Sequence, residues 1–383
     1  MRRVLSGLMF LSVVLSIWGG MHYFVWTLVA RNTGISPGWR WAALGLLLAL
    51  ASSTLVSLLR LVPRALAPWL WTPAFVWAGF VFLLFFLLLI ADVVFGVARL
   101  VMTGTDPVAA ARLEALLTVG LSLFLATLAW SRAHGEVAIK RVEVTLSKLP
   151  TAMSGYSIVQ VTDLHVSPDT TIERVRRIVE RVNSLSPDLI ALTGDLVDGA
   201  PELLREAIAP LADLRSKHGA FFVTGNHEYY SGADRWMHAY RGLGVRVLHN
   251  ERVTVGDGEH TFDLAGVPDW RGGSFSPDHQ PRLADVLNGR KADREVVLLA
   301  HQPKQFPEAA QLDVGLQISG HTHGGQIWPF TWFIHLAERH VAGLHAIGRS
   351  QLYVSRGTGF WGPPLRLGSP TEITHITLRA TTT

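Results

Sequence analysis

Short clusters of histidine, aspartate and asparagine recur along the second half of the sequence, and these residue types bind metals. The strongest is Gly320-His321-Thr322-His323, in which one residue separates two histidines. Carboxylate oxygen, amide oxygen and imidazole nitrogen without sulfur suit a pair of divalent ions that activate water against phosphorus. The other clusters are, in chain order, Asp163-Leu164-His165, Gly194-Asp195-Leu196-Val197-Asp198, Gly225-Asn226-His227-Glu228 and the single His301.

Each cluster follows a short apolar run that predicts a buried strand. The first three runs alternate with two stretches of helical spacing, which indicates βαβ units and a partly parallel sheet. Because ligands gather beyond the carboxyl ends of the strands in such sheets, we expect the clusters to meet at one edge. The runs lie at 156–161, 189–192 and 221–223, and the helical stretches at 171–185 and 201–214.

The later part of the sequence is richer in strands than in helices. Two of these strands end at His301 and His321, so they bring further ligands to the same place. We expect two sheets that face each other, with helices on the outside. The strands are predicted at 246–248, 261–266, 295–300, 315–319, 351–355 and 372–378, after an extended first strand within 133–148.

The spacing within the clusters predicts how the side chains point. Asp163 and His165 are two residues apart, so on an extended segment both would face the same side. The same reasoning places His321 and His323 together. Asp195 follows a glycine, which allows a tight turn, and it is the candidate for a carboxylate that bridges two metals.

Single clusters are weak evidence, because an isolated Asp-x-His pair or Gly-Asp turn is common in proteins that bind no metal. The complete ordered series, with each member at a strand end, instead favours a metal site. Asp198 has two interpretations: it orients a metal ligand or it caps a loop, and we favour the loop cap. Glu228, beside His227, leaves the same alternatives open.

The first 135 residues differ from the rest in composition. Four apolar stretches, at 4–30, 42–59, 69–97 and 113–130, approach or exceed the roughly 20 residues that a transmembrane helix needs. We expect the first to be retained as a helix and not cleaved as a signal peptide. Arginines that flank these stretches account for the net charge of +4, so the charge does not indicate a nucleic-acid partner. The sequence contains no cysteine, which excludes disulfides and thiolate metal ligands.

The predicted spans also suggest an orientation. An even number of spans places both termini on one side of the membrane. With the N-terminus in the cytoplasm, seven basic residues fall in the inside segments and four in the outside loops, which favours a catalytic domain on the cytoplasmic face. We therefore predict a multi-pass transmembrane domain at 1–135, a linker with the first strand at 136–153 and a catalytic domain at 154–383.

Taken together, the ordered clusters resemble the calcineurin-like metallophosphoesterase superfamily over about residues 154–379. The extended run from Gly320 to Gln326 resembles a bacterial, often membrane-anchored branch. The resemblance implies an α/β fold, a four-layer α/β/β/α sandwich. The apolar stretches, which lie outside the resemblance, predict an all-α membrane domain of about four transmembrane helices before it. We therefore expect a multi-pass protein of the bacterial inner (plasma) membrane.

The resemblance further implies a role for each cluster. Two divalent ions are expected, and Mn, Fe, Zn and Co all suit the ligands. His227, with Asn226, would contact the phosphate and stabilise the transition state or protonate the leaving group. Asp163, His165, Asp195 and His323 would hold one ion, and Asp195, Asn226, His301 and His321 the other, with Asp195 as the bridge.

We expect a membrane-tethered, metal-dependent phosphodiesterase or pyrophosphatase whose phosphoester substrate is lipid-linked or a nucleotide-lipid ester. Membrane lipids are therefore expected partners. The aromatic segment at 327–334 could guide an acyl chain or enter the membrane interface, or it could pack as a buried loop. Two alternatives remain: a phosphodiesterase of soluble nucleotides with a membrane anchor, and a metal-binding membrane signalling module without catalysis. The completeness of the ligand set favours an enzyme.

Overall fold

The computed structural model describes residues 2–59, 67–101, 104 and 106–381. The chain divides into two units. The first contains 1–134 together with two short segments from the C-terminal half, 327–329 and 362–367. The second contains the remaining residues, 135–326, 330–361 and 368–383.

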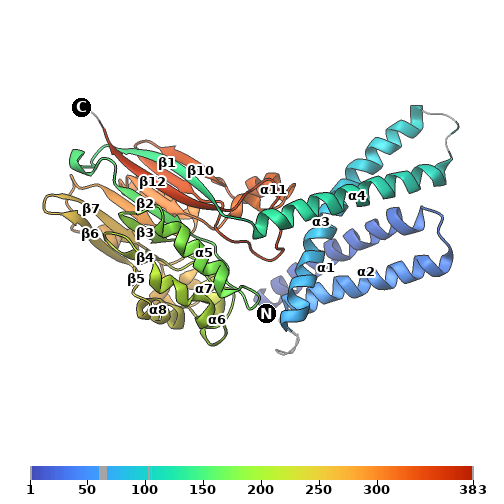
Figure 1. Cartoon of the computed structure of the whole chain (residues 1–383), viewed down its shortest axis with the longest axis horizontal. Helices are drawn as coiled ribbons and strands as arrows, with labels where there is room; N and C mark the ends of the chain where they lie inside the picture. The colour runs from blue at the N-terminus through green and yellow to red at the C-terminus, as the bar shows by residue number, and fades with distance from the viewer. Residues whose placement is uncertain (1, 60–66, 102–103, 105, 382–383) are drawn as a thin grey trace. The chain divides into compact units, whose positions relative to one another are not determined.

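Four long helices dominate the first unit (Figure 1). All four are long and apolar enough to cross a membrane, with candidate spans at Leu11–Arg31, Pro37–Leu58, Trp69–Val101 and Pro107–His134. The predicted number of spans is therefore confirmed by length and composition. The third helix packs against the other three. The helices are α1 (Arg2–Trp26), which continues as a π-helical turn η1 (Thr27–Arg31), α2 (Pro37–Leu58), α3 (Ala67–Val101) and α4 (Pro107–His134).

The two short segments complete the packing of this unit. Ile327 and Leu365 are buried with Ala129 of α4 in one apolar cluster, which also includes Phe82 of α3. The backbone N–H of Arg366 donates to the carbonyl of Ala129 at 2.9 Å. Residues distant in the sequence therefore belong to the same packed body as α3 and α4.

The second unit is built on two six-stranded sheets. In the first sheet, β2 to β5 run parallel, and β12 lies antiparallel to β2 and parallel to β1. Its order is β1 (Ala138–Leu146), β12 (Glu372–Ala380), β2 (Ser157–Val161), β3 (Leu189–Leu192), β4 (Ala220–Phe222) and β5 (Arg246–Val247).

The second sheet has a parallel centre and antiparallel edges. Strands β11, β9, β8 and β7 are parallel, whereas β10 and β6 pair antiparallel with their neighbours. The edge strands β6 and β10 were not predicted from the sequence. The order is β10 (Gly343–Ile347), β11 (Ser350–Val354), β9 (Leu316–Ser319), β8 (Val296–Leu299), β7 (His260–Gly266) and β6 (Glu251–Asp257).

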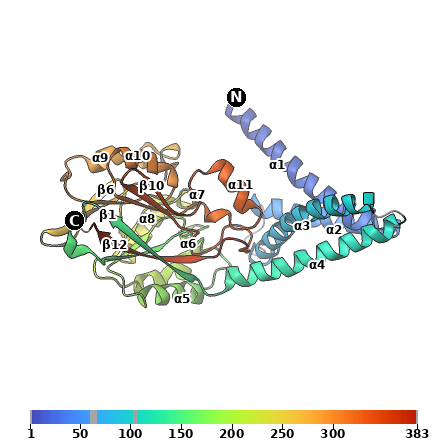
Figure 2. The same ribbon diagram turned by 90° about the horizontal axis from the view of Figure 1, so that it is seen from above.

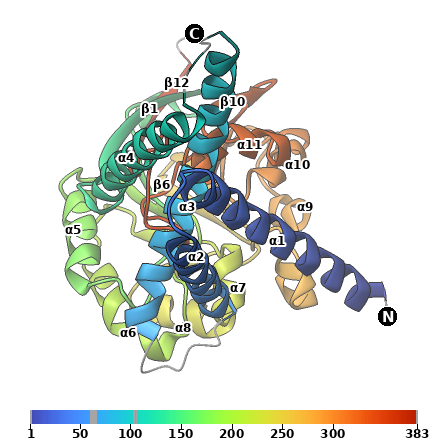
Figure 3. The same ribbon diagram turned by 90° about the vertical axis from the view of Figure 1, so that its right-hand side faces the viewer.

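Helices cover the outer face of each sheet, which gives the expected four layers (Figure 2; Figure 3). The central strands are buried on both faces because apolar residues occupy successive positions, as in β3. One apolar cluster lies between the sheets, and one lies between each sheet and its helices. Helices α5 (Ile172–Asn183), α6 (Pro201–Ile208) and α8 (Ala233–Gly242) pack on the first sheet, and α9 (Leu283–Leu287) and α10 (Phe306–Gln311) on the second.

The helix predicted at 201–214 is shorter than expected. It ends at Ile208 and gives way to a 3-10 turn, because Pro210 lacks an amide hydrogen and cannot continue the α-helix. The remaining helices are α7 (Asn226–Ser231) and α11 (Phe330–Ala337), and the 3-10 turns are η2 (Thr151–Met153), η3 (Ala209–Asp213), η4 (Gly272–Ser274), η5 (Pro277–His279), η6 (Pro303–Gln305) and η7 (His323–Gly325).

Candidate metal centre

The polar clusters follow β2, β3, β4, β8 and β9, as the sequence predicts. The expectation of extended backbone within the clusters was wrong. Asp163, His165, His321 and His323 all have positive φ values, between 48° and 76°, and Asp195 has φ 52°. Such left-handed conformations are costly for non-glycine residues and gather at functional sites, where the surrounding fold enforces them. The paired side chains therefore converge through sharp turns and not through strand alternation.

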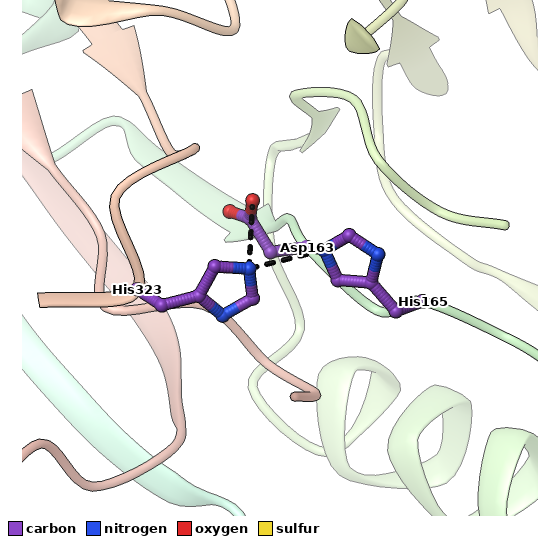
Figure 4. A group of neighbouring side chains, drawn as sticks. All are labelled: Asp163, His165 and His323. Carbon is purple, nitrogen blue, oxygen red and sulfur yellow. Dashed lines mark hydrogen bonds and ion pairs between the residues drawn. The ribbon is translucent and has the colours of Figure 1, made fainter. Parts of the chain in front are cut away.

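Asp163, His165 and His323 form the first group of converging ligands (Figure 4). The Nε2 atoms of the two histidines lie 3.0 Å apart, and Nε2 of His323 lies 3.5 Å from a carboxylate oxygen of Asp163. The Asp163 side chain is fully buried, and both of its oxygens accept the backbone N–H of His321. That bond ties the turn after β9 to the turn after β2.

Asp195, His301 and His321 form a second group. Nε2 of His301 lies 3.1 Å from Oδ2 of Asp195 and 3.3 Å from Nδ1 of His321. The Nδ1–H of His301 donates to the carbonyl of Thr193 at 2.7 Å, which leaves Nε2 directed at the carboxylate. This is the usual arrangement of a metal-binding histidine, whose second nitrogen is held by a backbone acceptor.

The two histidines of the second group have opposite pKa shifts. Burial and the neighbouring His301 lower the pKa of His321 to about 3, so its imidazole is neutral, the form that binds metals. Burial alone would lower the pKa of His301, but the Asp195 carboxylate outweighs it and raises that pKa. A metal that binds His301 at Nε2 therefore displaces a proton.

Asn226, the first residue of α7, supplies an amide oxygen. Its side chain is buried, yet Oδ1 has no hydrogen-bond partner among the residues that the structure describes. A buried oxygen without a donor costs free energy, and a bound cation would satisfy it. Asp195 also belongs to a third group, with His165 and His227, and its Oδ2 lies 3.9 Å from Nε2 of His165 as well as 3.1 Å from Nε2 of His301. The carboxylate, amide and imidazole donors that meet here fit a metal site.

Asp198 does not act as a loop cap, which corrects the favoured sequence interpretation. Its Oδ1 accepts from Nδ1 of His165 at 2.9 Å and from Nδ1 of His227 at 2.5 Å. Burial opposes its charge, but these two histidines hold the pKa of Asp198 well below its usual range. One carboxylate oxygen therefore orients both a candidate metal ligand and the candidate proton donor.

His227 lies beside Asp195. Its Nε2 lies 4.0 Å from Oδ2 of Asp195, and its backbone N–H donates to Asp195 Oδ1. Burial alone would lower the pKa of His227, but Asp195 and Asp198 raise it to about 9. The rings of Tyr230 and Trp361 meet the imidazole edge-on, with centroids 5.2 and 5.9 Å away.

Glu228 holds the loop that carries Asp195. Its two carboxylate oxygens accept the backbone N–H groups of Asp195, Leu196 and Gly225, at 2.7 to 2.9 Å. Burial and the charge of Asp195 raise the pKa of Glu228 to about 8. Glu228 therefore positions the loop that carries Asp195.

Two glycines allow the turns to approach each other. A Cβ atom on Gly225 would collide with the carboxylate of Asp195, and one on Gly320 would collide with the carboxylate of Asp163. Both substitutions would displace a candidate ligand. The glycines in these clusters are therefore required by the close contact of neighbouring loops.

Sequence reasoning associated Phe360 and Trp361 with the aromatic segment near the metal ligands, but it did not predict that Tyr230 and Trp361 contact His227. Tyr230 lies three residues later on α7, a helical spacing that could have indicated the contact. Trp361 is held by Gln326, whose amide donates to the Trp361 carbonyl and accepts its N–H, both at 2.9 Å. Nothing in the spacing of residues 326 and 361 signals this pairing.

The chain is similar to several known proteins. A family model described as calcineurin-like phosphoesterase matches residues 156–325. The chain is 38% identical over 279 residues to a Bos taurus transmembrane protein with metallophosphoesterase domain, covering 70% of this chain and 63% of that protein. It is 36% identical over 274 residues to an uncharacterized metallophosphoesterase of Helicobacter pylori, covering 70% and 71%. Among solved structures, phosphopantetheinyl hydrolase from Mycobacterium tuberculosis aligns with 56% of this chain and 96% of its own, at 13% identity and a TM-score of 0.36. The chain spans less than two thirds of the length of the cattle relative.

Proposed function

Because the chain belongs to the calcineurin-like phosphoesterases, we propose that it is a membrane-tethered phosphodiesterase or pyrophosphatase that uses two divalent ions on a lipid-linked phosphoester. The observation that carries the proposal is the position of the buried Asp195, whose Oδ2 lies within 4 Å of both His165 and His301, together with the buried Asn226 oxygen that has no partner among the described residues. Mn, Fe, Zn or Co would suit these oxygen and nitrogen donors.

Two divalent ions at such a site supply an activated water and neutralise charge on the phosphoryl oxygens. Asp163, His165, Asp195 and His323 would hold one ion, and Asp195, Asn226, His301 and His321 the other. These roles come from the family, and the distances between the side chains support them.

His227 would donate the proton that the leaving oxygen needs. Its Nδ1–H is held by Asp198, which leaves Nε2 to face the substrate. As the bond between phosphorus and the leaving oxygen breaks, the Nε2 proton passes to that oxygen, while the oxygen of water forms the new bond to phosphorus. Before the transfer Asp198 stabilises the protonated ring, and afterwards it still accepts the Nδ1–H of the neutral ring.

A lipid-linked substrate is supported by apolar surface close to His227. Tyr230 and Trp361 border the histidine, and about half of the Trp361 side chain is exposed. Helix α11, which begins seven residues after His323, exposes Phe330, Trp332 and Leu336. An exposed apolar helix of this kind suits the interface between lipid and water. The aromatic segment 327–334 is thus only partly a buried loop, because Ile327 is buried and the large side chains of α11 are exposed.

The location of the enzyme is part of the proposal. We place it in the bacterial inner membrane with the catalytic unit on the cytoplasmic face, on the distribution of basic residues around the four candidate spans. No nucleic-acid partner is proposed.

The test uses the full-length chain in detergent, stripped of metal and reloaded with Mn²⁺. Metal-dependent release of p-nitrophenol from bis-p-nitrophenyl phosphate is expected for the wild type and not for Asp195→Asn. A series of phosphodiesters with lengthening acyl chains should then show kcat/KM rising with chain length below the micelle threshold. Trp361→Ala should reduce that dependence, whereas Leu203→Ala, at an exposed position on α6, should not.

Three outcomes separate the alternatives. Faster turnover of a soluble nucleotide diester, with no effect of chain length, would favour a nucleotide phosphodiesterase with an anchor. Two bound metals without hydrolysis of any ester would favour the binding module. Full activity of Asp195→Asn would contradict the assigned site.

A further inference from the structure

A cavity of about 550 Å³ opens beside the candidate metal ligand His321. It lies beyond the carboxyl ends of β7, β8 and β9, and its lining includes Trp270, Arg271, Gln302 and Lys304. The metal site and the proton donor do not use these four residues. Their chemistry differs from that of the aromatic residues near His227, because two of the four are cations.

The buried carboxylate of Asp269 fixes the turn that carries Arg271. Asp269 is fully buried, and its oxygens accept the side-chain amide of Gln302 at 2.9 and 3.1 Å. The same carboxylate accepts the backbone N–H of Arg271 at 2.9 Å, and the Asp269 backbone N–H donates to Thr224. The turn is therefore fixed to the loop after β4 and to the segment after β8, so the backbone that carries Arg271 is held in place.

The two cationic side chains differ in whether a carboxylate neutralises their charge. The guanidinium of Arg271 has no hydrogen bond or ion pair with any residue that the structure describes, and it is exposed to solvent. Nζ of Lys304 lies 2.9 Å from a carboxylate oxygen of Glu338. The cavity, which His321 also lines, therefore has an uncompensated positive charge.

We propose that this cavity binds a second phosphate group of the substrate, with Arg271 and Lys304 as its ligands and Trp270 as a surface for the adjoining non-polar atoms. A planar guanidinium that is free to form two parallel hydrogen bonds suits phosphate, and Lys304 adds a second charge. The inference rests on the proposed phosphoesterase activity and specifies its substrate. It assigns the second phosphate to the retained part of the molecule, because the leaving group faces His227.

The test compares two esters that differ in one group. Both are p-nitrophenyl phosphodiesters of glycerol, and only one carries a terminal phosphate on the glycerol. The full-length, Mn²⁺-loaded wild type should show the lower KM for the ester with the terminal phosphate. Arg271→Gln and Lys304→Gln should each raise that KM about 10-fold, as expected for loss of a charge-assisted hydrogen bond, and leave kcat unchanged.

Two controls isolate the terminal phosphate. KM for the plain ester should stay within about twofold of wild type in both variants, because the metal ligands are untouched. Arg282→Gln should change neither ester, since this exposed arginine pairs with Asp285 on its own helix. Equal KM values for the two esters in the wild type, or no response to Arg271→Gln, would overturn the proposal.

A binding measurement separates this proposal from the proposed activity. Glycerol 1,3-bisphosphate is the product expected from the phosphate-bearing ester, and its affinity can be measured by calorimetry without turnover. It should bind more tightly than glycerol 1-phosphate, and Arg271→Gln should remove the difference. If neither ester is hydrolysed but this difference is found, the phosphoesterase assignment fails and the anion site stands. Equal affinity for the two products refutes the anion site.

Discussion

Replacing Asp198 by alanine is expected to damage metal binding and turnover together. The two histidines that it orients have different roles, since His165 is a candidate metal ligand and His227 the candidate proton donor. Loss of the partner of a metal-bound histidine typically lowers metal affinity about 10- to 100-fold. General acid catalysis typically raises the rate about 10²–10⁴-fold. Loss of the carboxylate that accepts the Nδ1–H of His227 should remove part of this rate enhancement.

The geometry allows a sharper comparison with asparagine. Both hydrogen bonds converge on one oxygen, Oδ1, so an asparagine oxygen at position 198 could still accept both. Only the charge is lost, and charge-assisted bonds are roughly twice as strong as neutral ones. Asp198→Asn should therefore cost about half as much free energy as Asp198→Ala, so that a 100-fold defect in alanine becomes about 10-fold in asparagine.

The assay has two independent readouts on the full-length protein. Metal content after equilibration at a series of free Mn²⁺ concentrations gives the affinity, and hydrolysis of bis-p-nitrophenyl phosphate at saturating Mn²⁺ gives kcat. Asp293→Ala is the matched control, because Asp293 is exposed and makes no ion pair with the described residues. The reasoning is refuted if Asp198→Ala keeps both quantities within about twofold of wild type. An equal loss in the asparagine variant would instead refute the argument from the shared oxygen.

The other predictions concern the bridge, the proton donor and a surface ion cluster. Asp195→Asn should abolish activity and lower Mn²⁺ content at both sites, as measured by elemental analysis; retention of two tightly bound ions would contradict its bridging position. His227→Ala should reduce kcat about 10²–10⁴-fold while metal content stays unchanged, and full activity would exclude the proton-donor role. Hydrogen bonding to Arg349 and Lys148 lowers the pKa of Asp313, so the stability that its charge contributes is present above its unfolded pKa and is lost as the pH falls through the lowered value. The melting temperature of Asp313→Asn should thus lie slightly below that of wild type at pH 7, and the difference should shrink below about pH 4.

Much of the scaffold was predictable because each element is specified locally. The run 189–192 is short and apolar at every position, which favours a strand buried on both faces. The spacing of Val175, Ile178, Val179 and Val182 identifies one face of α5. The edge strands β6 and β10 were missed, because their polar and apolar residues alternate too weakly to mark a buried face. The sequence therefore identifies the central strands and the residues that follow them.

The detailed geometry of the site depends on long-range contacts that no local pattern contains. Asp198 was interpreted as a cap because its two partners, at positions 165 and 227, lie far away in the chain. The left-handed turns at Asp163 and His321 also escaped prediction, since neighbouring loops, and not local preference, hold them there. The identity of the candidate ligands was predictable, and the contacts that aim them were not.

The short segments 327–329 and 362–367 pack against the long helices, so removing the helices would expose residues of the C-terminal half. Ile327 and Leu365 obtain their burial from Ala129 and Phe82, so a fragment that starts after residue 135 would expose them to water. Such a fragment is expected to associate or precipitate even though every candidate metal ligand is retained. A soluble catalytic fragment would therefore need polar substitutions at Ile327 and Leu365. Exchange of the helical unit for an unrelated membrane anchor would likewise need matching changes in both segments.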